Sequence, residues 1–440
     1  MSKKAAARRQ QVIDVLTEAF DDLLRVDPRG FRTKFRKMAA DPFAFYRGSA
    51  CVFYADMADL DDQWADDRTS RVWIHGDLHA ENFGTYMNAE GQLVFDVNDF
   101  DEAYLGHFSW DLRRFVASLA LMGWQKALPE GDVRRLAAEY LRAYVDQIRR
   151  YDQTDDDLGE FALRLDNTEG AVLAVLRAAR ARTRLGLLET MTVVIDHKRR
   201  FTDGATARHL SASERSMVLA AFDRYLETIP PRKRSRRTVY YDVKDVVAST
   251  GFGIGSAGLP AYNVLVEGYN QALENDIVLS MKQGNSPAVG QVVKDDRLRG
   301  FFENDGHRTV VSQRALQAHT DQFLGWTTID GVGFVVDELS PYEADLDWSD
   351  ITEPDEMAPL LRDLGRATAK VHCASDEDSD EELVDFQTEE AILDVIGDQE
   401  QEFVDDVVEF AMAYAETARS DHALFVDAFR AGDIAGLSAT

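Results

Sequence analysis

Residues 71–114 constrain the fold of this chain more than any other stretch. The β-branched run Val72-Trp73-Ile74 leads into His75-Gly76-Asp77, and two β-rich runs follow at residues 83–86 and 93–95, separated by the turn sequence Asn-Ala-Glu-Gly. This pattern is typical of a strand, a loop and a β-hairpin. The hairpin ends in the sequence Asn-Asp-Phe-Asp, residues 98–101. The stretch therefore predicts a strand, a polar loop, a hairpin and an acidic turn, in that order.

The polar residues of this stretch match what phosphoryl transfer requires. That chemistry needs an aspartate near the attacking hydroxyl, as base or orienter, and an asparagine and a second aspartate that hold Mg²⁺ on the nucleotide phosphates. Asp77 is the candidate for the first role, and His75 beside it is a further catalytic candidate. Asn82, Asp99 and Asp101 are the candidate Mg²⁺ ligands. The layout is typical of a kinase catalytic loop followed by its metal-binding turn.

Two other interpretations of these residues stay open. Asp77 and Asn82 are of types that commonly cap turns, and residues 99–102 are also compatible with a solvated acidic loop. His75, Asp77 and His79 alternate along the chain like a ligand cluster, which would indicate a metal-dependent hydrolase. No further His-rich segment of the sequence completes that ligand set.

A second candidate region lies later in the chain. Residues 240–249, 262–267 and 277–281 are β-rich; a glycine-rich stretch separates the first two, and Lys282 ends the third. Glycines let a backbone approach phosphates closely, and a lysine neutralises phosphate charge. The residues expected to bind the nucleotide here are Gly251, Gly253, Gly255, Ser256, Gly258 and Lys282. A dinucleotide-binding fingerprint would have to open a helix, whereas a proline and a β-rich run follow. A flexible hairpin with a surface lysine is the remaining alternative.

The helix expected at residues 307–323 contains no glutamate to pair with Lys282, although kinases use one. Gln313 and Glu303, just before that helix, are the possible substitutes. Residues 334–339 predict a strand that leads to a hinge, with Glu338 as a further nucleotide contact. Other helices are expected at residues 8–26, 109–124 with Ser109 as a possible N-cap, 131–150 with more helix to about residue 229, 357–373 and 401–430.

Composition limits the classes of partner and compartment. The net charge of −29 argues against non-specific binding to nucleic acid or to an anionic membrane. The sequence has no apolar run of membrane-spanning length, and two cysteines give no disulfide framework, so we expect a cytoplasmic protein. The phosphotransferase interpretation adds a small-molecule substrate. Only 11 of the 49 basic residues are lysine. The acidic surplus with few lysines suits a high-salt cytosol, and high genomic GC content would also favour arginine.

The chain resembles the bacterial and archaeal family called domain of unknown function 2252. The matching segments include residues 42–48, 76–84, 94–102, 110–114, 310–314 and 321–326, so they span nearly the whole chain. That family is similar to the protein-kinase-like superfamily, particularly its aminoglycoside and choline kinase branch. The resemblance implies an α+β, two-lobed kinase-like fold and leaves the substrate open.

The order of the motifs is unusual for a kinase, because the catalytic loop precedes the glycine-rich loop. The order matches that of a kinase whose chain ends are joined and whose chain is then opened between the hinge and the catalytic loop. We therefore expect a circularly permuted fold. The expected parts are a helical catalytic-loop lobe at residues 1–232, a β-rich nucleotide lobe at 238–345, and helices at 346–440 that complete the first lobe. The expected function is transfer of phosphate from ATP with Mg²⁺. A nucleotide-binding pseudoenzyme that acts as a regulator and an AMP transferase stay open as alternatives.

Overall fold

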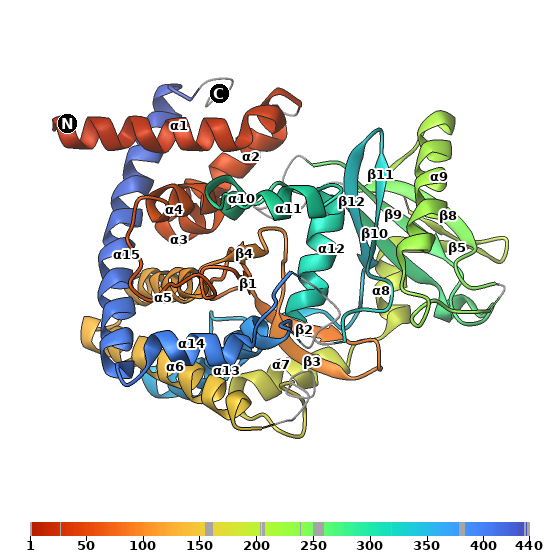
Figure 1. Ribbon diagram of the computed structural model, residues 1–440. Coiled ribbons are helices and arrows are strands. Elements are labelled where there is room, and N and C mark those ends of the chain that lie inside the picture. Colours follow the sequence, from red (N-terminus) through yellow and green to blue (C-terminus); the bar gives the residue numbers. More distant parts are fainter. Residues whose placement is uncertain are drawn as a thin grey trace.

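The computed structural model of the chain describes residues 2–26, 28–154, 162–202, 204, 207–237, 239–249, 259–317, 319–377, 383–434 and 437. Within these residues the fold is of the mixed α+β class, as expected from the sequence. Helices gather on one side of the molecule, and a six-stranded sheet lies on the other (Figure 1). In this part of the chain, every helix is too short or too polar to cross a membrane.

The first third of the chain forms helices around two small antiparallel pairings. The helices are α1 (Lys3–Val26), α2 (Pro28–Met38), α3 (Pro42–Gly48), α4 (Ala50–Met57), α5 (Phe108–Gln125) and α6 (Glu130–Asp152). The strands are β1 (Val72–Ile74), β2 (Phe83–Met87), β3 (Leu93–Val97) and β4 (Tyr104–Gly106). Strand β1 pairs with β4, and β2 and β3 form the predicted hairpin. Helix α3 begins where Pro42 follows Asp41, whose side chain accepts a hydrogen bond from the Ala44 amide at 2.9 Å.

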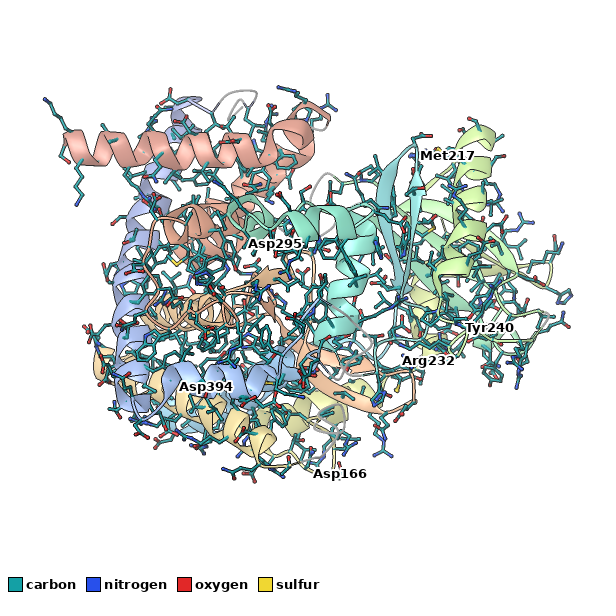
Figure 2. All side chains as sticks on the ribbon, viewed as in Figure 1. Asp166, Met217, Arg232, Tyr240, Asp295 and Asp394 are labelled. Atoms are coloured by element: carbon teal, nitrogen blue, oxygen red, sulfur yellow. The ribbon has the colours of Figure 1, made fainter. Side chains whose placement is uncertain are left out.

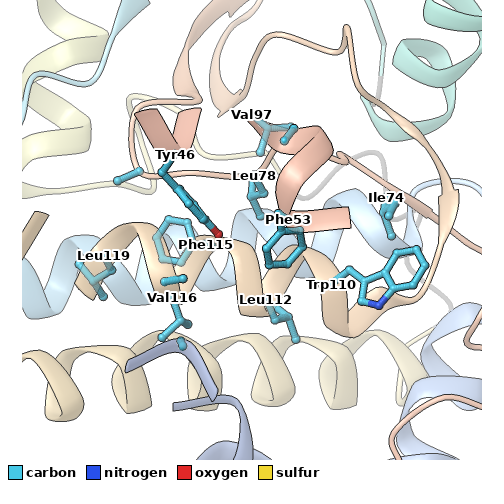
Figure 3. Packing of buried hydrophobic residues seen from close by; sticks show 14 of the residues in the cluster. Tyr46, Phe53, Ile74, Leu78, Val97, Trp110, Leu112, Phe115, Val116 and Leu119 are labelled. Atoms are coloured by element: carbon cyan, nitrogen blue, oxygen red, sulfur yellow. The ribbon is translucent and has the colours of Figure 1, made fainter. Parts of the chain in front are cut away.

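Helix α5 forms the centre of the main hydrophobic core. Nearly all of its residues are buried, which fits a helix that is covered on every side. Figure 3 shows its side chains packed against those of α3, α4 and the residues after β1, among them Leu112, Phe115, Tyr46, Phe53 and Leu78. The prediction of Ser109 as the N-cap is wrong: His107 holds that position, and the Ser109 hydroxyl donates instead to Asp62 at 2.5 Å.

The larger sheet has the strand order β11-β12-β10-β9-β8-β7 and is antiparallel throughout. Its strands are β7 (Ala207–His209), β8 (Val243–Ser249), β9 (Ala261–Val266), β10 (Ile277–Gln283), β11 (Gly325–Ile329) and β12 (Val332–Glu338). Helices α10 (Ala288–Val292), α11 (Asp296–Phe301) and α12 (Asp305–Leu316) and a short 3₁₀ turn, η2 (Leu273–Asn275), lie between its strands in the chain. The strands expected at residues 240–249, 262–267, 277–281 and 334–339 are therefore confirmed, with small shifts at their ends.

The expectation of more helix up to about residue 229 is wrong in part. Helices α7 (Gly170–Arg180), α8 (Arg184–Met191) and α9 (Ala212–Thr228) are present, but a hairpin of β5 (Thr192–Ile195) and β6 (Lys198–Phe201) and strand β7 interrupt them. Strand β7 pairs with β8, and α9 packs on β11. The sheet thus includes residues that precede position 232, the boundary expected from the sequence.

After β12 the chain returns to the helical side. Strand β13 (Ala344–Asp345) pairs with β2 and extends the β2–β3 hairpin to three strands. Helices α13 (Pro354–Cys373), α14 (Thr388–Ile396) and α15 (Glu400–Ala431) follow. Helix α15 crosses α1, where Arg8 pairs with Asp421 at 2.6 Å and Arg9 pairs with Asp433 (Figure 1). The first and last described helices are therefore packed together.

Stability should rise with salt, because like charges repel across a surface that carries a net charge of −29. Exposed acids on this surface include Asp166 and Asp394, labelled in Figure 2. Each lies near one arginine, which compensates a single charge and leaves the net surplus in place. The screening length falls from about 30 Å at 0.01 M salt to about 3 Å at 1 M. The melting temperature in KCl should therefore increase over this range more than in a neutral osmolyte of equal osmolality. A melting temperature that stays constant or falls would contradict the explanation.

Candidate active site

The loop after β1 is held by a buried carboxylate. Asp111, in the first turn of α5, accepts hydrogen bonds from the backbone amides of His75 at 2.6 Å and Gly76 at 2.9 Å. Gly76 has φ +80°, and a Cβ at this position would lie 2.2 Å from the carbonyl oxygen of Glu102. Only glycine fits that backbone position without displacement. Asp111 therefore holds the loop through two of its backbone amides.

Asp111 is itself oriented from two other helices. The Nε2 atom of His372, on α13, donates to Asp111 at 3.3 Å, and the hydroxyl of Tyr144, on α6, donates to His372 Nδ1 at 2.8 Å. The tautomer follows from this network, since Asp111 only accepts. Asp111 and His372 are completely buried. Helices α5, α6 and α13 therefore fix the position of the Asp111 carboxylate, and this carboxylate holds the loop after β1.

His75 links the loop to the acidic turn. Its Nε2 atom donates to the Asn98 carbonyl at 2.8 Å, and its Nδ1 atom accepts from the Asp77 amide at 3.3 Å. The ring is fully buried. Because both nitrogens are engaged, His75 positions the loop against the turn, and its catalytic role stays a prediction. The same bonds prevent it from serving as a metal ligand, and among the described residues no three His, Cys, Asp or Glu side chains form a metal-binding group.

Asp77 lies at the cleft and is paired with a buried arginine. Its Oδ1 atom accepts from Arg114 Nε at 2.7 Å and lies 2.5 Å from Nη2. The Arg114 guanidinium stacks over Tyr46, 4.4 Å from the ring centroid, and over Phe53. Burial raises the pKa of the Asp77 carboxyl, and the charge of Arg114 opposes that shift. Arg114 thus fixes the position of the Asp77 carboxylate, and the Asp77 side chain is 16% exposed.

Asn82 is tied to the same loop. Its side-chain Nδ2 atom donates to the backbone carbonyl of Asp77 at 2.9 Å. Its backbone carbonyl accepts from the backbone amide of Asn98 at 3.1 Å. The side-chain amide is therefore oriented, and its oxygen is the atom that remains to bind a cation. These bonds connect the Asp77 loop to the start of the acidic turn.

The acidic turn follows β3. Asp99 is exposed and adopts φ 62°, a conformation that aspartate tolerates better than most residues. Burial, together with the neighbouring Asp99 charge, raises the pKa of Asp101 to about 6. Arg308, buried on α12, donates to the backbone carbonyls of Ala103 at 2.9 Å and Asp101 at 2.8 Å. Helix α12 therefore pins the turn through its main chain.

Lys282 reaches this region from the six-stranded sheet. It lies opposite Val335 in the β10–β12 register, so Asp337, two residues further on, shares its face of the sheet. Asp337 is the largest cause that raises the pKa of Lys282, and Asp101, Glu343 and Asp99 act in the same direction. The charges of Asp99 and Asp101 thus act on Lys282, and Arg308 joins the backbone of Asp101 to that of Asn285, which follows strand β10.

The other residues that the sequence predicts to contact the nucleotide are not seen beside Lys282. Asp337, rather than Gln313 or Glu303, supplies the charge with the largest effect on Lys282. Gln313 donates to Gln317 along α12 at 3.1 Å. Glu338 lies on the opposite face of β12 and pairs with Arg184. Gly251, Gly253, Gly255, Ser256 and Gly258 lie outside the described residues.

Several of these groups line one cleft. Its charged lining residues are the acids Asp77, Asp99, Asp101 and Glu102 and the bases Lys34 and Arg47. Burial raises the pKa of Glu102 to about 7, while the Ala288 amide, which donates to its carboxylate at 2.5 Å, opposes that shift. The cleft therefore contains carboxylates and cations within one enclosed space.

A comparison with models of protein families identifies the chain. The model described as uncharacterized protein conserved in bacteria (DUF2252) matches residues 25–428. The chain belongs to this family. No curated protein and no solved structure matches it. The DUF2252 match includes all the charged residues of the cleft, from Lys34 to Asp101 and Glu102, and also Lys282 and Asp337.

Sequence reasoning on this DUF2252 chain missed four charged residues of the site: Lys34, Arg114, Arg308 and Asp337. Arg114 and Asp337 stood in recognised segments, but nothing in their spacing gave them a partner. Arg308 reaches the acidic turn from a helix that is 207 residues away in sequence. The one available signal was that arginine and lysine are rarely buried unless they are paired.

Proposed function

We propose that this protein transfers a phosphoryl group from Mg·ATP to a hydroxyl group of a small molecule in the cytoplasm. The observation that carries the proposal is the junction between the acidic turn and the strand of Lys282, which come from distant parts of the chain. Arg308 donates there to the carbonyls of Asp101 and Asn285, and the charges of Asp99 and Asp101 act on Lys282. A triphosphate needs both a direct cation and carboxylates that hold Mg²⁺, and this combination supplies both. The Asp77 loop beside them would hold the acceptor.

The donor set fits the metal. Asn82, Asp99 and Asp101 offer one amide and two carboxylate groups, and Mg²⁺ in phosphate-transfer sites typically uses one or two carboxylates together with substrate phosphates. When bound, Mg²⁺ neutralises charge on the phosphates. Asp101 would be ionised above a pKa of about 6. At neutral pH the chain therefore presents the charged form that such a ligand requires.

Asp77 would act on the acceptor. The acceptor oxygen forms a bond to the γ-phosphorus, the bond from that phosphorus to the bridging oxygen of ADP breaks, and the hydroxyl proton passes to the Asp77 carboxylate. Because burial raises the pKa of Asp77, the carboxylate is a better base than an exposed one. Arg114 holds it in place. Lys282 would neutralise the phosphates directly.

The arrangement of the sheet supports a permuted kinase-like fold. Hairpin β8–β9, strand β10 with Lys282, helix α12, and strands β11 and β12 follow one another, and the chain then crosses to the β2–β3 hairpin through β13. This is the order of phosphate loop, lysine, helix and hinge in a kinase. In a circularly permuted kinase the first and last helices should lie close together. Helix α1 packs against α15, which supports this order. We extend the proposal to this fold.

Two alternatives predict different products. The charge of Arg114 opposes the rise in the pKa of Asp77, and a carboxylate held in this ion pair favours a regulator that binds Mg·ATP without turnover. Transfer of AMP would release pyrophosphate in place of ADP. Incubation of the protein with ATP, Mg²⁺ and a metabolite library distinguishes these cases, because phosphoryl transfer yields ADP that depends on an acceptor. Pyrophosphate, or binding with no product, would replace the proposal by one of the alternatives.

Asp99→Asn should weaken Mg²⁺-dependent ATP binding by at least about tenfold, since changes around a metal site typically cost 10- to 100-fold in affinity. Asparagine keeps the size and the tolerance for positive φ while it removes the charge. Calorimetry with and without Mg²⁺ measures the effect. Asp330→Asn is the matched control, because Asp330 is exposed in the β11–β12 turn and has φ 50°. Equal affinities of the two variants would remove Asp99 from the metal site.

A further inference from the structure

Residues 177–237 form a basic segment in an otherwise acidic chain. The segment contains 15 lysine or arginine and 6 aspartate or glutamate residues, whereas the whole chain has a net charge of −29. It includes helix α8, the β5–β6 hairpin and helix α9. None of its residues is among those that line the cleft. The proposed function therefore does not account for this concentration of positive charge.

The β5–β6 hairpin within this segment exposes apolar side chains. Val193, Val194 and Ile195 are 39%, 44% and 53% exposed. Successive residues of a strand point to opposite faces, so neither face of β5 is covered along these three residues. Leu185, on the neighbouring helix α8, is exposed as well. Apolar side chains that gather in one exposed place typically mark a surface that binds a partner.

Two basic side chains accompany the apolar ones. In the register of the hairpin, Val193 lies opposite Arg200. Ile195 lies opposite Lys198, so all four side chains share one face. Lys198 and Arg200 are exposed, and within the described part of the chain no carboxylate forms an ion pair with either. This face thus offers two positive charges to a partner.

The base of the hairpin is held in place by the residue between these two. Arg199 is only 5% exposed, and it donates to the Leu273 carbonyl at 3.2 Å and to the Thr192 hydroxyl at 2.8 Å. The backbone amide of Phe201 donates to the Asp245 carboxylate at 3.0 Å. A partner would therefore meet a surface that is already formed, which lowers the entropic cost of binding.

Strand β5 also has an open edge. Among the described strands it pairs with β6 alone, in a sheet of two strands. An edge strand presents backbone amides and carbonyls that can pair with a strand added by another protein. A lipid surface or a nucleic acid has no matching row of amides and carbonyls. The open edge therefore favours a protein segment as the partner, and the positive charges favour an acidic one.

We propose that β5 binds an extended segment of another protein in which acidic and apolar residues alternate. The acidic side chains lie on the face of Lys198 and Arg200, and the apolar ones lie on the opposite face with Val194. The added strand is about 10 Å from β6, twice the spacing of neighbouring strands. Glutamate and the long side chains of Lys198 and Arg200 span this gap together, across Val193 and Ile195.

Binding of fluorescent peptides to the full chain tests this inference. The probe is a peptide of about six residues, a typical strand length, in which glutamate and valine alternate. A second peptide has the same sequence with methylated backbone amides, which prevents strand pairing, and a third has lysine in place of glutamate. Fluorescence anisotropy at low salt should show binding of the first peptide alone. Failure of the first peptide to bind, or equal binding of either of the others, would overturn the inference.

A charge reversal locates the site. Lys198→Glu combined with Arg200→Glu should weaken binding of the glutamate–valine peptide at least about tenfold, because attraction becomes repulsion at both positions. Lys3→Glu combined with Lys4→Glu is the control, since it makes the same change in net charge at exposed residues of α1. Both variants alter exposed side chains and should fold, as melting curves will show. Equal affinities of the two variants for the peptide would contradict the site.

Two other anionic partners are outcomes of the same experiment. A single-stranded DNA with the charge of the peptide, and vesicles of phosphatidylserine and phosphatidylcholine, are offered to the protein under the same conditions. Both should bind more weakly than the peptide. Tighter binding of either one, lost in the variant with Lys198→Glu and Arg200→Glu, would replace the protein partner by a nucleic acid or a membrane and so overturn the inference.

Discussion

Asp77→Asn should lower the turnover of the acceptor reaction by roughly 10²- to 10⁴-fold, the usual contribution of a general base. The asparagine oxygen can still accept from Arg114, so the loop should keep its shape. Affinity for Mg·ATP should stay within about twofold, because the residues proposed to hold the nucleotide and its metal are separate from Asp77. Rates of ADP formation with the acceptor found by screening, together with calorimetric binding of ATP, measure both quantities.

The control for this experiment is Asp67→Asn, a change at an exposed aspartate in the loop before β1. It should leave turnover and ATP affinity unchanged. Turnover of Asp77→Asn at the rate of the unmodified protein would show that the loop does not carry the catalytic carboxylate. A joint loss of ATP binding and turnover would instead indicate that Asp77 shapes the nucleotide site.

Asp111→Ala should destabilise the protein by roughly 3–5 kcal/mol, the range seen when one partner of a buried charged interaction is removed. The change leaves the amides of His75 and Gly76 without their acceptor in a buried place, where unsatisfied donors are costly. Denaturation in urea gives the free energy of unfolding. Asp111→Asn should cost less, because one oxygen remains to accept.

A surface change on a neighbouring helix provides the comparison. Asp132→Ala, in the first turn of α6, removes a partly exposed carboxylate and should shift the free energy of unfolding by less than about 1 kcal/mol. If Asp111→Ala were as mild, the two backbone hydrogen bonds could not be what holds the Asp77 loop.

Local patterns made the hairpin and the strands of the sheet predictable. Alternating apolar residues between turn residues define β2 and β3 without reference to the rest of the chain. The β5–β6 hairpin carried a similar signal in Thr192–Ile195, yet a helical reading of its surroundings obscured it. Its two-residue turn places Asp196 and His197 at positive φ. Glycine is the usual signal of such a turn, and this turn has none.

The candidate site was predictable only in its chemistry. Asp77, Asn82 and Asp99 were found because their residue types and spacing match a known task. Their supports were not, because a support is defined by a partner that is close in space and distant in sequence. Ser109 illustrates the limit: it has the right type and position for a helix cap, but its hydroxyl binds Asp62 instead.

Arg308 has a mechanical consequence. Its guanidinium binds carbonyls of the acidic turn and, at 2.6 Å, the carbonyl of Asn285, which follows the strand of Lys282. Its helix begins against the backbone of β12, where a Cβ on Gly306 would lie 2.6 Å from the Phe334 nitrogen. The sheet, the helix and the turn are thus joined through one side chain. A motion that displaces the sheet would also displace Asp99. Lys282 and Asp99, the residues proposed to bind Mg·ATP, would then move together.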